Sequence, residues 1–495
     1  MKVTRRRLTQ SLAAGLSACG RPRRPNIVLF YADDLRATAL DLYNPDAVAM
    51  PNLARLAASG ITFDHSYTPH PLCQPARVSL WTGQYSSKHG SRYNQKPMAD
   101  GTPNMAEWFR GAGYRMGIFG KNHCFTPAQL DRWFDDDYSI GSAKWKSALS
   151  PETVKEMREV AEWRGRRGGP MGPPAAAPFS HELFPTHIAS ERAIEFIGAR
   201  QGGQPFFAWV SLVDPHTPAD VPEKFAGALP LERTRLPPCR DKEMSTRNTR
   251  MRIYEYLIRG REIPDERLAR YLSIYSGKNA FLDFELGRVM DALESRGFRE
   301  NTILIFASDN GDFAGEHHLI VKTGCLLDSM VRMPLVLSWP GGGVPQGRRE
   351  NALVSHVDLA PTLLSMAQLP PLPSAQGRLL PLNASVSRRA YVYAEYGNGD
   401  PYYDWSEARQ VGPASRPGEY ALRTRLELEH LARRERAGHL RMIRTHTHKL
   451  IADSNGDVEF YDLAADPGEL TNVHGESRYA REEQRLIALL NQPLR

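Results

Sequence analysis

Four continuous apolar runs, each followed by polar side chains, constrain the fold of this chain more than any other feature. Runs of this length without polar alternation are typical of strands buried on both faces of a parallel sheet. They cover Asn26–Ala32, Tyr114–Phe119, Phe206–Val213 and Thr302–Ala307. Met333–Trp339 is expected to add a fifth strand. With helical segments between the runs, the sequence predicts an α/β fold with a large, mainly parallel sheet flanked by helices.

The segments between these runs are predicted to be helices or insertions. Ser190–Arg200 is expected to form a helix that begins with a capping serine. Asp265–Arg296 is expected to form a long helical region that is interrupted near Gly277. Gly165–Pro178 is rich in glycine, proline and alanine and is expected to lack regular structure. Leu231–Arg261 is highly charged, and we expect it at the surface.

The composition changes near residue 370, where Pro370-Pro371-Leu372-Pro373 interrupts the chain. We therefore expect the main α/β domain over residues 25–370 and a smaller α+β subdomain over residues 371–495. The smaller part is predicted to contain an antiparallel sheet, because Asn455-Gly456 is typical of a hairpin turn between two strands. A terminal helix is expected from Ser477 to Asn491, and a charged helix within Trp405–Ala437.

Residues 1–24 are predicted to be an export signal followed by a tether. A basic start with Arg5–Arg7 precedes an apolar run, in the pattern of a twin-arginine signal. Leu16–Cys19 resembles a bacterial lipoprotein box, in which Cys19 would carry a lipid anchor. We therefore expect an exported protein in the periplasm or at the cell surface. A plain cleaved signal or a basic tail is the alternative.

Charge and cysteine content exclude several classes of protein. The net charge is +7, but Lys2 and Arg5–Arg7 supply four of these charges, which leaves a nearly neutral body. Such a body does not suit a nucleic-acid-binding protein. The sequence contains no apolar stretch long enough for a transmembrane helix. Five cysteines, two of them with proposed roles, allow at most one internal disulfide and show no zinc-site spacing.

Two polar pairs follow predicted strands and suggest a metal site. Asp33 and Asp34 follow the first run, and Asp309 and Asn310 follow the last. The carboxyl ends of parallel strands lie at one edge of a sheet, so the two pairs should meet. Four oxygen donors suit a hard cation such as Ca²⁺ or Mg²⁺, whereas zinc more often selects histidine or cysteine. Alone, either pair is equally typical of a turn or a helix cap.

Three cations and two histidines are candidates for binding and reacting with an anion. Arg77, Lys121 and Lys322 can give charge-assisted hydrogen bonds to sulfate or phosphate oxygens. His123 and His216 follow predicted strands, and an imidazole can carry protons near neutral pH. The alternative for each cation is a solvated surface charge, and for each histidine a structural role.

Taken together, these residues resemble the formylglycine-dependent sulfatase family of the alkaline phosphatase superfamily. The resemblance extends from Asn26 to about Pro370 and again over Met442–Asn472. It departs from the family pattern at Gln84, where arginine is common, and at Ala76, a known variant of the usual serine. The motifs that carry it are Ala32-Asp33-Asp34, Cys73-x-Pro-Ala-Arg77 with Leu80-x-Thr-Gly83, Gly120-Lys121-Asn122-His123, Pro215-His216, and Ser308-Asp309-Asn310-Gly311 followed by Lys322.

The resemblance implies an alkaline-phosphatase-like catalytic domain that hydrolyses sulfate esters. A separate maturation enzyme would oxidise Cys73 to formylglycine. One hydroxyl of the hydrated aldehyde, activated by the metal and Asp309, would attack sulfur and form a covalent sulfated intermediate. His216 and Lys322 would assist the leaving alcohol. His123 would take a proton from the second hydroxyl and so expel sulfate.

The resemblance also implies the ligand set of the site. Asp33, Asp34, Asp309 and Asn310 would hold Ca²⁺, or Mg²⁺, together with an oxygen of residue 73. Arg77 and Lys121 would hold residue 73 and the developing charge. A helix that starts just after Cys73 would point its positive end at the anion.

Two other functions remain open from the sequence. The first is a phosphonate monoester or phosphodiester hydrolase on the same fold, although relatives of that kind often carry histidine where Asn310 stands. The second is a non-catalytic, glycan-binding lipoprotein. Export suggests a sulfated glycan as the substrate.

Overall fold

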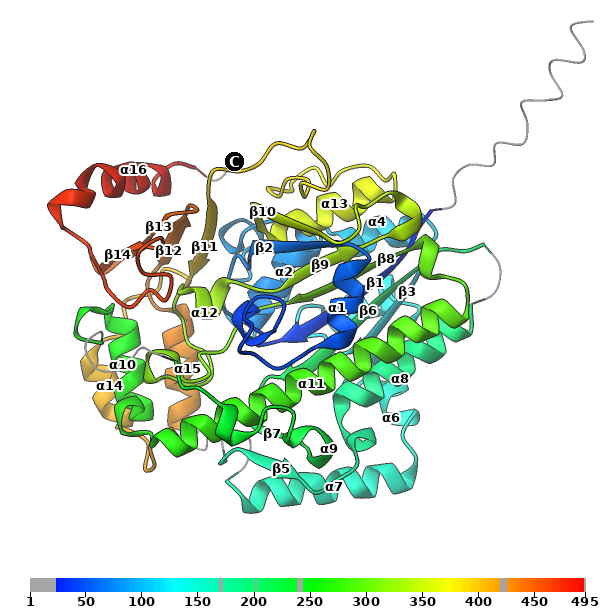
Figure 1. Ribbon diagram of the computed structural model, residues 1–495, viewed down its shortest axis with the longest axis horizontal. Helices are drawn as coiled ribbons and strands as arrows, with labels where there is room; N and C mark the ends of the chain where they lie inside the picture. Colours follow the sequence, from blue (N-terminus) through cyan, green and yellow to red (C-terminus); the bar gives the residue numbers. More distant parts are fainter. Residues whose placement is uncertain (1–23, 169–171, 201–202, 238–243, 419–424, 494–495) are drawn as a thin grey trace, which may run out of the picture.

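The computed structural model describes residues 24–168, 172–200, 203–237, 244–418 and 425–493. They form an eight-stranded sheet between two helical layers, beside a four-stranded sheet (Figure 1). The order of the large sheet is β10–β2–β9–β8–β1–β6–β3–β4. Its strands are β1 (Asn26–Asp33), β2 (Ile61–Tyr67), β3 (Arg115–Gly120), β4 (Asp136–Ser139), β6 (Phe206–Pro215), β8 (Thr302–Ser308), β9 (Leu335–Ser338) and β10 (Arg348–Ser355).

The four predicted apolar runs form adjacent strands in the middle of this sheet, in the order β8–β1–β6–β3. All pair in parallel, and Leu29 of β1 is aligned with Ile305 of β8 and Trp209 of β6. The prediction of an α/β fold with a mainly parallel sheet is therefore confirmed. The expected fifth strand is β9, which lies in the same sheet but runs antiparallel to β8 and β2.

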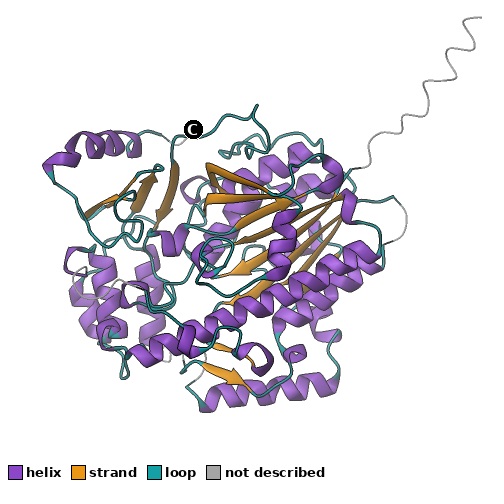
Figure 2. Ribbon diagram, in the orientation of Figure 1, coloured by secondary structure: helices purple, strands orange, loops and turns teal. Residues whose placement is uncertain are grey.

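Helices cover both faces of the sheet (Figure 2). Alternate residues of β1 enter opposite cores: Val28 packs with α1, α8 and α11, and Leu29 packs with α2, α4, α5 and α13. In the second core the Trp81 ring of α2 contacts the Trp209 ring. The helices are α1 (Pro51–Ala58), α2 (Cys73–Thr82), α4 (Met105–Gly111), α5 (Pro127–Trp133), α8 (Pro185–Gly198), α11 (Asp265–Ser295) and α13 (Leu359–Met366).

The C-terminal part contains the predicted antiparallel sheet and terminal helix. Its strands, in order, are β11 (Val392–Tyr396), β12 (Leu440–Arg444), β13 (His448–Asp453) and β14 (Val458–Asp462). Asn455-Gly456 lies in the turn between β13 and β14, as predicted. Helix α16 (Ala480–Leu490) covers this sheet through Leu486 and Leu490. Beside the sheet lie α10 (Thr249–Ile258), α14 (Trp405–Val411) and α15 (Arg425–Arg436).

Two predicted helix features are wrong. Helix α8 begins at Pro185 rather than Ser190, and the Ser190 hydroxyl donates to the Thr186 carbonyl within the helix. Proline at the first position of a helix needs no backbone partner for its nitrogen. Helix α11 continues through Gly277 without interruption. A Cβ at Gly277 would lie 2.7 Å from the Phe225 carbonyl oxygen, so glycine permits close packing here.

The expectation that Gly165–Pro178 lacks regular structure is also wrong at both ends. Helix α7 (Pro151–Arg166) extends into this stretch, and Ala175–Ala177 form β5, which pairs in parallel with β7 (Asp220–Pro222). Ala177 of β5 and Val221 of β7 lie in one buried cluster with Ile274 and Phe281 of α11. The connection from β4 to β6 also contains α6 (Ala143–Ser147), and α9 (Glu223–Ala226) follows β7.

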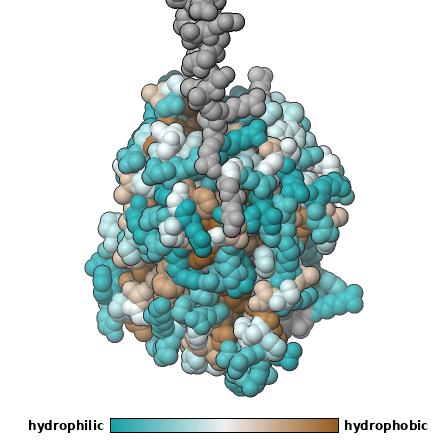
Figure 3. Space-filling model, turned by 90° about the vertical axis from the view of Figure 1, so that its right-hand side faces the viewer, coloured by the Kyte–Doolittle hydropathy of each residue, from teal (hydrophilic) through white to brown (hydrophobic). Residues whose placement is uncertain are grey.

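The predicted signal, with Cys19, lies outside the described residues. Among the described residues, no helix combines the length and apolar character that crossing a membrane requires. The face shown in Figure 3 is mainly hydrophilic with scattered apolar patches. Cys73, Cys124 and Cys325 are buried free thiols.

Gly277 gives a test of how closely α9, the helix that follows β7, packs on α11. We expect Gly277→Ala to lower the free energy of unfolding by about 1–3 kcal/mol, because the added methyl meets the Phe225 carbonyl. Gly165→Ala in α7 is the matched control, since a Cβ there meets nothing within 4 Å. Alanine should stabilise that helix by up to about 1 kcal/mol. The measurement is the free energy of unfolding of both variants in urea. Equal values for Gly277→Ala and Gly165→Ala would contradict the close packing at Gly277.

Candidate functional site

The predicted site residues meet at the carboxyl edge of the large sheet. Asp33 and Asp34 stand at the end of β1, Asp309 and Asn310 follow β8, and Lys121 and His123 follow β3. His216 follows β6, and α2 brings Cys73 and Arg77 to the same place. Lys322 arrives from the loop after β8, where its ammonium contacts Asp34. The structure therefore brings together all the residues singled out from the sequence.

Cys73 is the first residue of α2, so the expected helix starts at this cysteine rather than after it. Its side chain is buried, and its Sγ donates to Asp33 Oδ1 at 3.2 Å. The Lys322 ammonium lies 2.6 Å from the same sulfur. Burial, followed by the charge of Asp33, raises the pKa of the Cys73 thiol far above its ordinary value. The side chain at position 73 is thus in contact with both a carboxylate and an ammonium group.

The carboxyl groups near Cys73 form a set that suits a cation. Ligand atoms of Asp33, Asp34, Cys73 and Asp309 all lie within 4.8 Å of one another. Asp34 Oδ2 and Asn310 Oδ1 are buried without a hydrogen-bond partner. Buried oxygens without a partner are costly unless an ion or water satisfies them. Apart from the Cys73 sulfur, the donor atoms are oxygens of Asp33, Asp34, Asp309 and Asn310, and such oxygens fit a hard divalent cation.

The protonation behaviour of these carboxyl groups reflects their crowding. Burial by itself would raise the pKa of Asp33, but the charges of Lys121, Lys322 and Arg77 outweigh it and hold the pKa well below its ordinary value. Burial raises the pKa of Asp34, against the opposing charge of Lys322. Burial and the charge of Asp33 raise the pKa of Asp309. Additional positive charge at this place would favour the ionised form of all three.

Arg77 links the carboxyl cluster to the sheet. Its side chain is completely buried, and its Nε donates to Asp309 Oδ2 at 2.7 Å. One terminal nitrogen donates to Ser211 Oγ on β6 at 2.5 Å, while the other has no partner. A buried guanidinium with an unused nitrogen is well suited to an anion. Lys121 forms an ion pair with Asp33.

Both candidate histidines are held as neutral rings. Burial, followed by the charge of Lys121, lowers the pKa of His123 to about 2, and its Nδ1 has no partner. Burial and the charge of Lys322 lower the pKa of His216 to about 3. His216 Nδ1 lies 2.7 Å from the Thr217 carbonyl, which assigns the proton to that nitrogen. His216 Nε2, 3.7 Å from Asp34 Oδ2, is then the nitrogen free to exchange a proton.

Sequence reasoning missed a row of polar side chains on α11 that supports the site. Tyr271, Tyr275 and Lys278 are spaced by four and three residues and so share one face of the helix. The Tyr275 hydroxyl donates to the Asp34 carbonyl at 2.7 Å. The Tyr271 hydroxyl donates at 2.9 Å to Asp312, whose other oxygen accepts from two backbone amides of the loop before Lys322.

Lys278 holds the loop that carries His216. Its ammonium donates to the carbonyls of His216 at 2.5 Å and Pro218 at 2.8 Å, and it pairs with Asp214 at 3.1 Å. The side chain is only 3% exposed. The available signal was the position of Lys278 on a predicted helix, where its neighbours one turn away are Ile274, Tyr275, Phe281 and Leu282. A lysine on such a face is expected to be buried, and a buried lysine needs partners.

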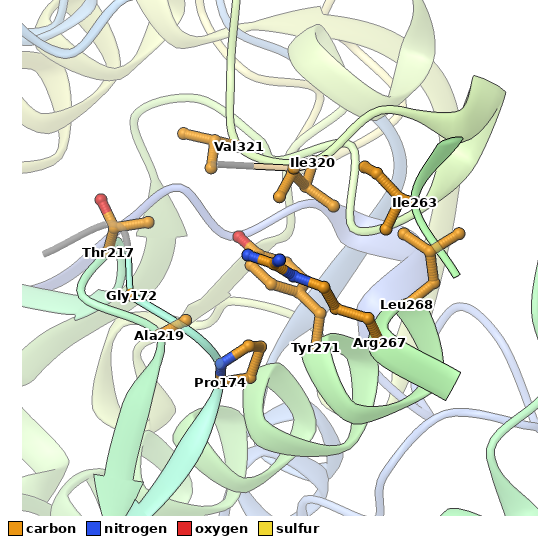
Figure 4. Close-up of a pocket in the computed structure, with 11 residues that line it drawn as sticks. Gly172, Pro174, Thr217, Ala219, Ile263, Arg267, Leu268, Tyr271, Ile320 and Val321 are labelled. Carbon is orange, nitrogen blue, oxygen red and sulfur yellow. The ribbon is translucent and has the colours of Figure 1, made fainter. Parts of the chain in front are cut away.

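A cleft opens from this site to the surface, with a cavity volume of about 590 Å³. Asp33, Lys121, His123 and His216 lie at its floor, and its walls include residues of α7 and α8. A second cavity adjoins it at Thr217, between the start of α11 and Ile320-Val321 (Figure 4). That cavity measures about 10 Å³, which is room for one water molecule at most. Of these two cavities, only the large cleft has room for a small organic molecule.

Comparison with known proteins identifies relatives along most of the chain. Residues 25–369 match the family model "Sulfatase", and residues 315–425 match "N-sulphoglucosamine sulphohydrolase, C-terminal". The chain is 28% identical to "Uncharacterized sulfatase YidJ" of Escherichia coli, over 70% of this chain and 68% of that protein. It is 24% identical to "N-acetylglucosamine-6-O-sulfatase" of Bacteroides thetaiotaomicron, over 97% and 89% of the two chains.

The fold also matches a solved structure. The phosphonate monoester hydrolase of Agrobacterium radiobacter superposes with a TM-score of 0.73, over 94% of this chain and 95% of that one, at 23% identity. This likeness confirms the alkaline-phosphatase-like architecture and does not distinguish between sulfate and phosphonate chemistry.

The support that α11 gives to the site can be tested at Lys278. We expect Lys278→Met to lower the free energy of unfolding by about 3–5 kcal/mol, because the buried carboxylate of Asp214 loses its partner. Lys146→Met, at an exposed position of α6, is the control and should change stability by less than about 0.5 kcal/mol. The measurement is unfolding of both variants in urea. Equal free energies of unfolding would show that Lys278 does not hold the His216 loop.

Proposed function

Because the chain belongs to the sulfatase family, we propose that it hydrolyses sulfate esters of carbohydrates with a formylglycine derived from Cys73 and a bound Ca²⁺. One observation carries the proposal: the Cys73 side chain lies at the start of a helix, among three carboxylates and a lysine. A helix N-terminus and buried cations attract an anion such as sulfate. The carboxylates would repel that anion unless a metal ion lay between them.

The residues that would hold the metal are Asp33, Asp34, Asp309 and Asn310. Asp34 Oδ2 and Asn310 Oδ1, which lack partners, are the oxygens available to it. When bound, a divalent cation would supply positive charge beside the sulfate oxygens and the nucleophile. We prefer Ca²⁺ to Mg²⁺ because several carboxylate and amide oxygens from different loops suit the larger and less rigid coordination shell.

The nucleophile would come from Cys73 after oxidation by a formylglycine-generating enzyme, which is therefore a required partner. The hydrated aldehyde supplies two hydroxyls, one for attack and one for release of sulfate. Arg77 and Lys121 would hold residue 73 in place, since both lie against carboxylates that contact it. Asp309, bonded to Arg77 Nε, would accept the proton of the attacking hydroxyl.

Two histidines and a lysine would handle the other protons. His216 Nε2 and the Lys322 ammonium lie beside Asp34 and would assist the departing alcohol. His123, a neutral imidazole with an unpartnered Nδ1, would accept the proton of the second hydroxyl. The cleft above these groups would hold the sugar that carries the ester.

Export completes the proposal. Residues 1–24 would direct the chain to the periplasm or the cell surface, with Cys19 as a lipid anchor. Sulfated glycans are met at that location, and the similar protein from Bacteroides thetaiotaomicron is named for a sulfated sugar.

Phosphonate chemistry is the second candidate, because a phosphonate monoester hydrolase shares this fold. Initial rates on 4-nitrophenyl sulfate and on 4-nitrophenyl phenylphosphonate separate the two. We expect a higher kcat/KM for the sulfate. A strong preference for the phosphonate would reverse the assignment.

The identity of the nucleophile can be tested at Cys73. In protein produced together with a formylglycine-generating enzyme, the peptide containing Cys73 should have the mass of formylglycine, and Cys73→Ala should lose at least about 10³-fold in kcat. Its thermal unfolding should stay close to that of the parent chain. Cys73→Ser should lose nearly as much unless the maturation enzyme accepts serine.

Two outcomes would contradict the proposed nucleophile. Full activity of Cys73→Ala would remove residue 73 from the reaction. An unmodified cysteine in protein without sulfatase activity would instead support a non-catalytic glycan-binding protein.

The metal site can be tested by thermal unfolding. After dialysis against EDTA, Ca²⁺ at 100 times its Kd should stabilise the chain by about 2.7 kcal/mol. Asp34→Asn should abolish this gain, whereas Asp46→Asn, at an exposed carboxylate, should retain it. We expect Mg²⁺ to give a smaller gain. An unchanged Tm with both ions would exclude this group of residues as a cation site.

A further inference from the structure

We infer that Arg164, Asp220 and Phe184 form a sugar-binding subsite in the wall of the catalytic cleft. All three line the cleft that contains Asp33 and Lys121 at its floor. The inference rests on the proposed function, since the sugar would be the part of a sulfate ester that leaves when sulfate is transferred.

Arg164 is held rigidly at the cleft wall. It stands near the end of α7, and its Nε lies 3.0 and 3.2 Å from the two carboxylate oxygens of Asp220. Its Nη2 donates to Asp220 Oδ2 at 2.7 Å. The guanidinium also lies over the Phe184 ring, 5.5 Å from its centroid. A bidentate pair stacked on an aromatic ring restricts the arginine to one orientation.

This arrangement leaves both a donor and an acceptor for a ligand. The bonds to Asp220 use Nε and Nη2, and within the described residues Nη1 has no hydrogen-bond partner. The Arg164 side chain is 25% exposed and that of Asp220 only 5%. Arg164 Nη1 can donate to one hydroxyl oxygen, while Asp220 can accept from a neighbouring hydroxyl. Adjacent hydroxyls of this kind are a general feature of sugars.

The net charge of the pair argues for a hydroxylated ligand rather than a second anion. Asp220 neutralises Arg164, and Asp214 neutralises Lys278, which lies in the same cleft. An additional sulfate or carboxylate at this wall would therefore face two carboxylates as well as two cations. Neutral hydroxyls meet no such repulsion and use both members of the pair.

The rest of the cleft is consistent with a sugar ring. Ile140, with 45% of its surface exposed, also lines the cleft, so an apolar side chain is available for the C–H face of a sugar. A volume of about 590 Å³ lies within the range of pockets that enclose a small organic ligand. A sulfate group alone would leave most of this space empty.

A structural role for Arg164 is the competing explanation, because its bond to Asp220 joins α7 to β7. The two roles differ in their effect on substrates. A purely structural role would affect all sulfate esters alike, whereas a subsite would matter only for a substrate with sugar hydroxyls.

The test compares two substrate types in the full chain produced with a formylglycine-generating enzyme. The substrates are 4-nitrophenyl sulfate and a panel of monosaccharides and disaccharides with one O-sulfate each, the sugars also being measured as competitors of 4-nitrophenyl sulfate. We expect Arg164→Met to lower kcat/KM for the best sugar by about 10- to 100-fold, mainly through KM. Activity on 4-nitrophenyl sulfate should stay within about twofold.

Two further variants sharpen the comparison. Asp220→Asn should shift selectivity in the same direction as Arg164→Met. Arg158→Met, at an exposed position of the same helix, is the matched control and should leave both substrates unchanged. Thermal unfolding of each variant separates loss of fold from loss of binding.

Each contrary result has a distinct meaning. Equal losses on both substrate types, or no loss on the sugar, would overturn the subsite. Hydrolysis of 4-nitrophenyl sulfate with no sugar acting as substrate or competitor would overturn it while leaving the sulfatase assignment intact. Absence of hydrolysis of every sulfate ester would instead refute the proposed function itself.

Discussion

The burial of three carboxylates at one sheet edge is the constraint on which the rest of this structure depends. Asp33, Asp34 and Asp309 are almost completely shielded from water. A buried charge without partners costs several kcal/mol, so each carboxylate must be matched by a cation or a donor. Arg77 and Lys322 supply two of these charges, but they come from a helix and a loop distant in sequence. The fold must hold every one of these segments at one point.

Helix α11 provides much of that support from outside the sheet. The C-terminal half of this long helix packs in the same core as Val28 of β1, and its N-terminal half contacts three site loops through Tyr271, Tyr275 and Lys278. These contacts satisfy backbone carbonyls and a buried aspartate rather than substrate atoms. A single rigid element therefore fixes the positions of Asp34, of His216 and of the loop before Lys322 relative to one another.

The sequence predicted the site better than its supports, for a physical reason. Apolar runs that end in Asp33-Asp34 or Asp309-Asn310 are local patterns, and parallel strands bring their ends together whatever the details of packing. The supports depend on pairings across long separations. Lys278 lies on a helix face whose nearest neighbours are apolar or aromatic, but no local pattern in the sequence shows that this face meets the His216 loop. The direction of β9 and the close packing at Gly277 likewise depend on neighbours in the folded chain, which the hydrophobic periodicity of the sequence does not specify.

The residues around Cys73 and the residues of the cleft wall come from different segments of the chain. The groups around Cys73 come from the ends of central strands and from α2, where any shift would disturb several buried charges together. Arg164 and Phe184 come from the connection between β4 and β6, which packs on α11 through apolar side chains. Apolar packing tolerates substitution of similar volume far better than a buried ion network does. The wall of the cleft can therefore change without disturbing the centre, and this wall is where differences in the recognised sugar should arise.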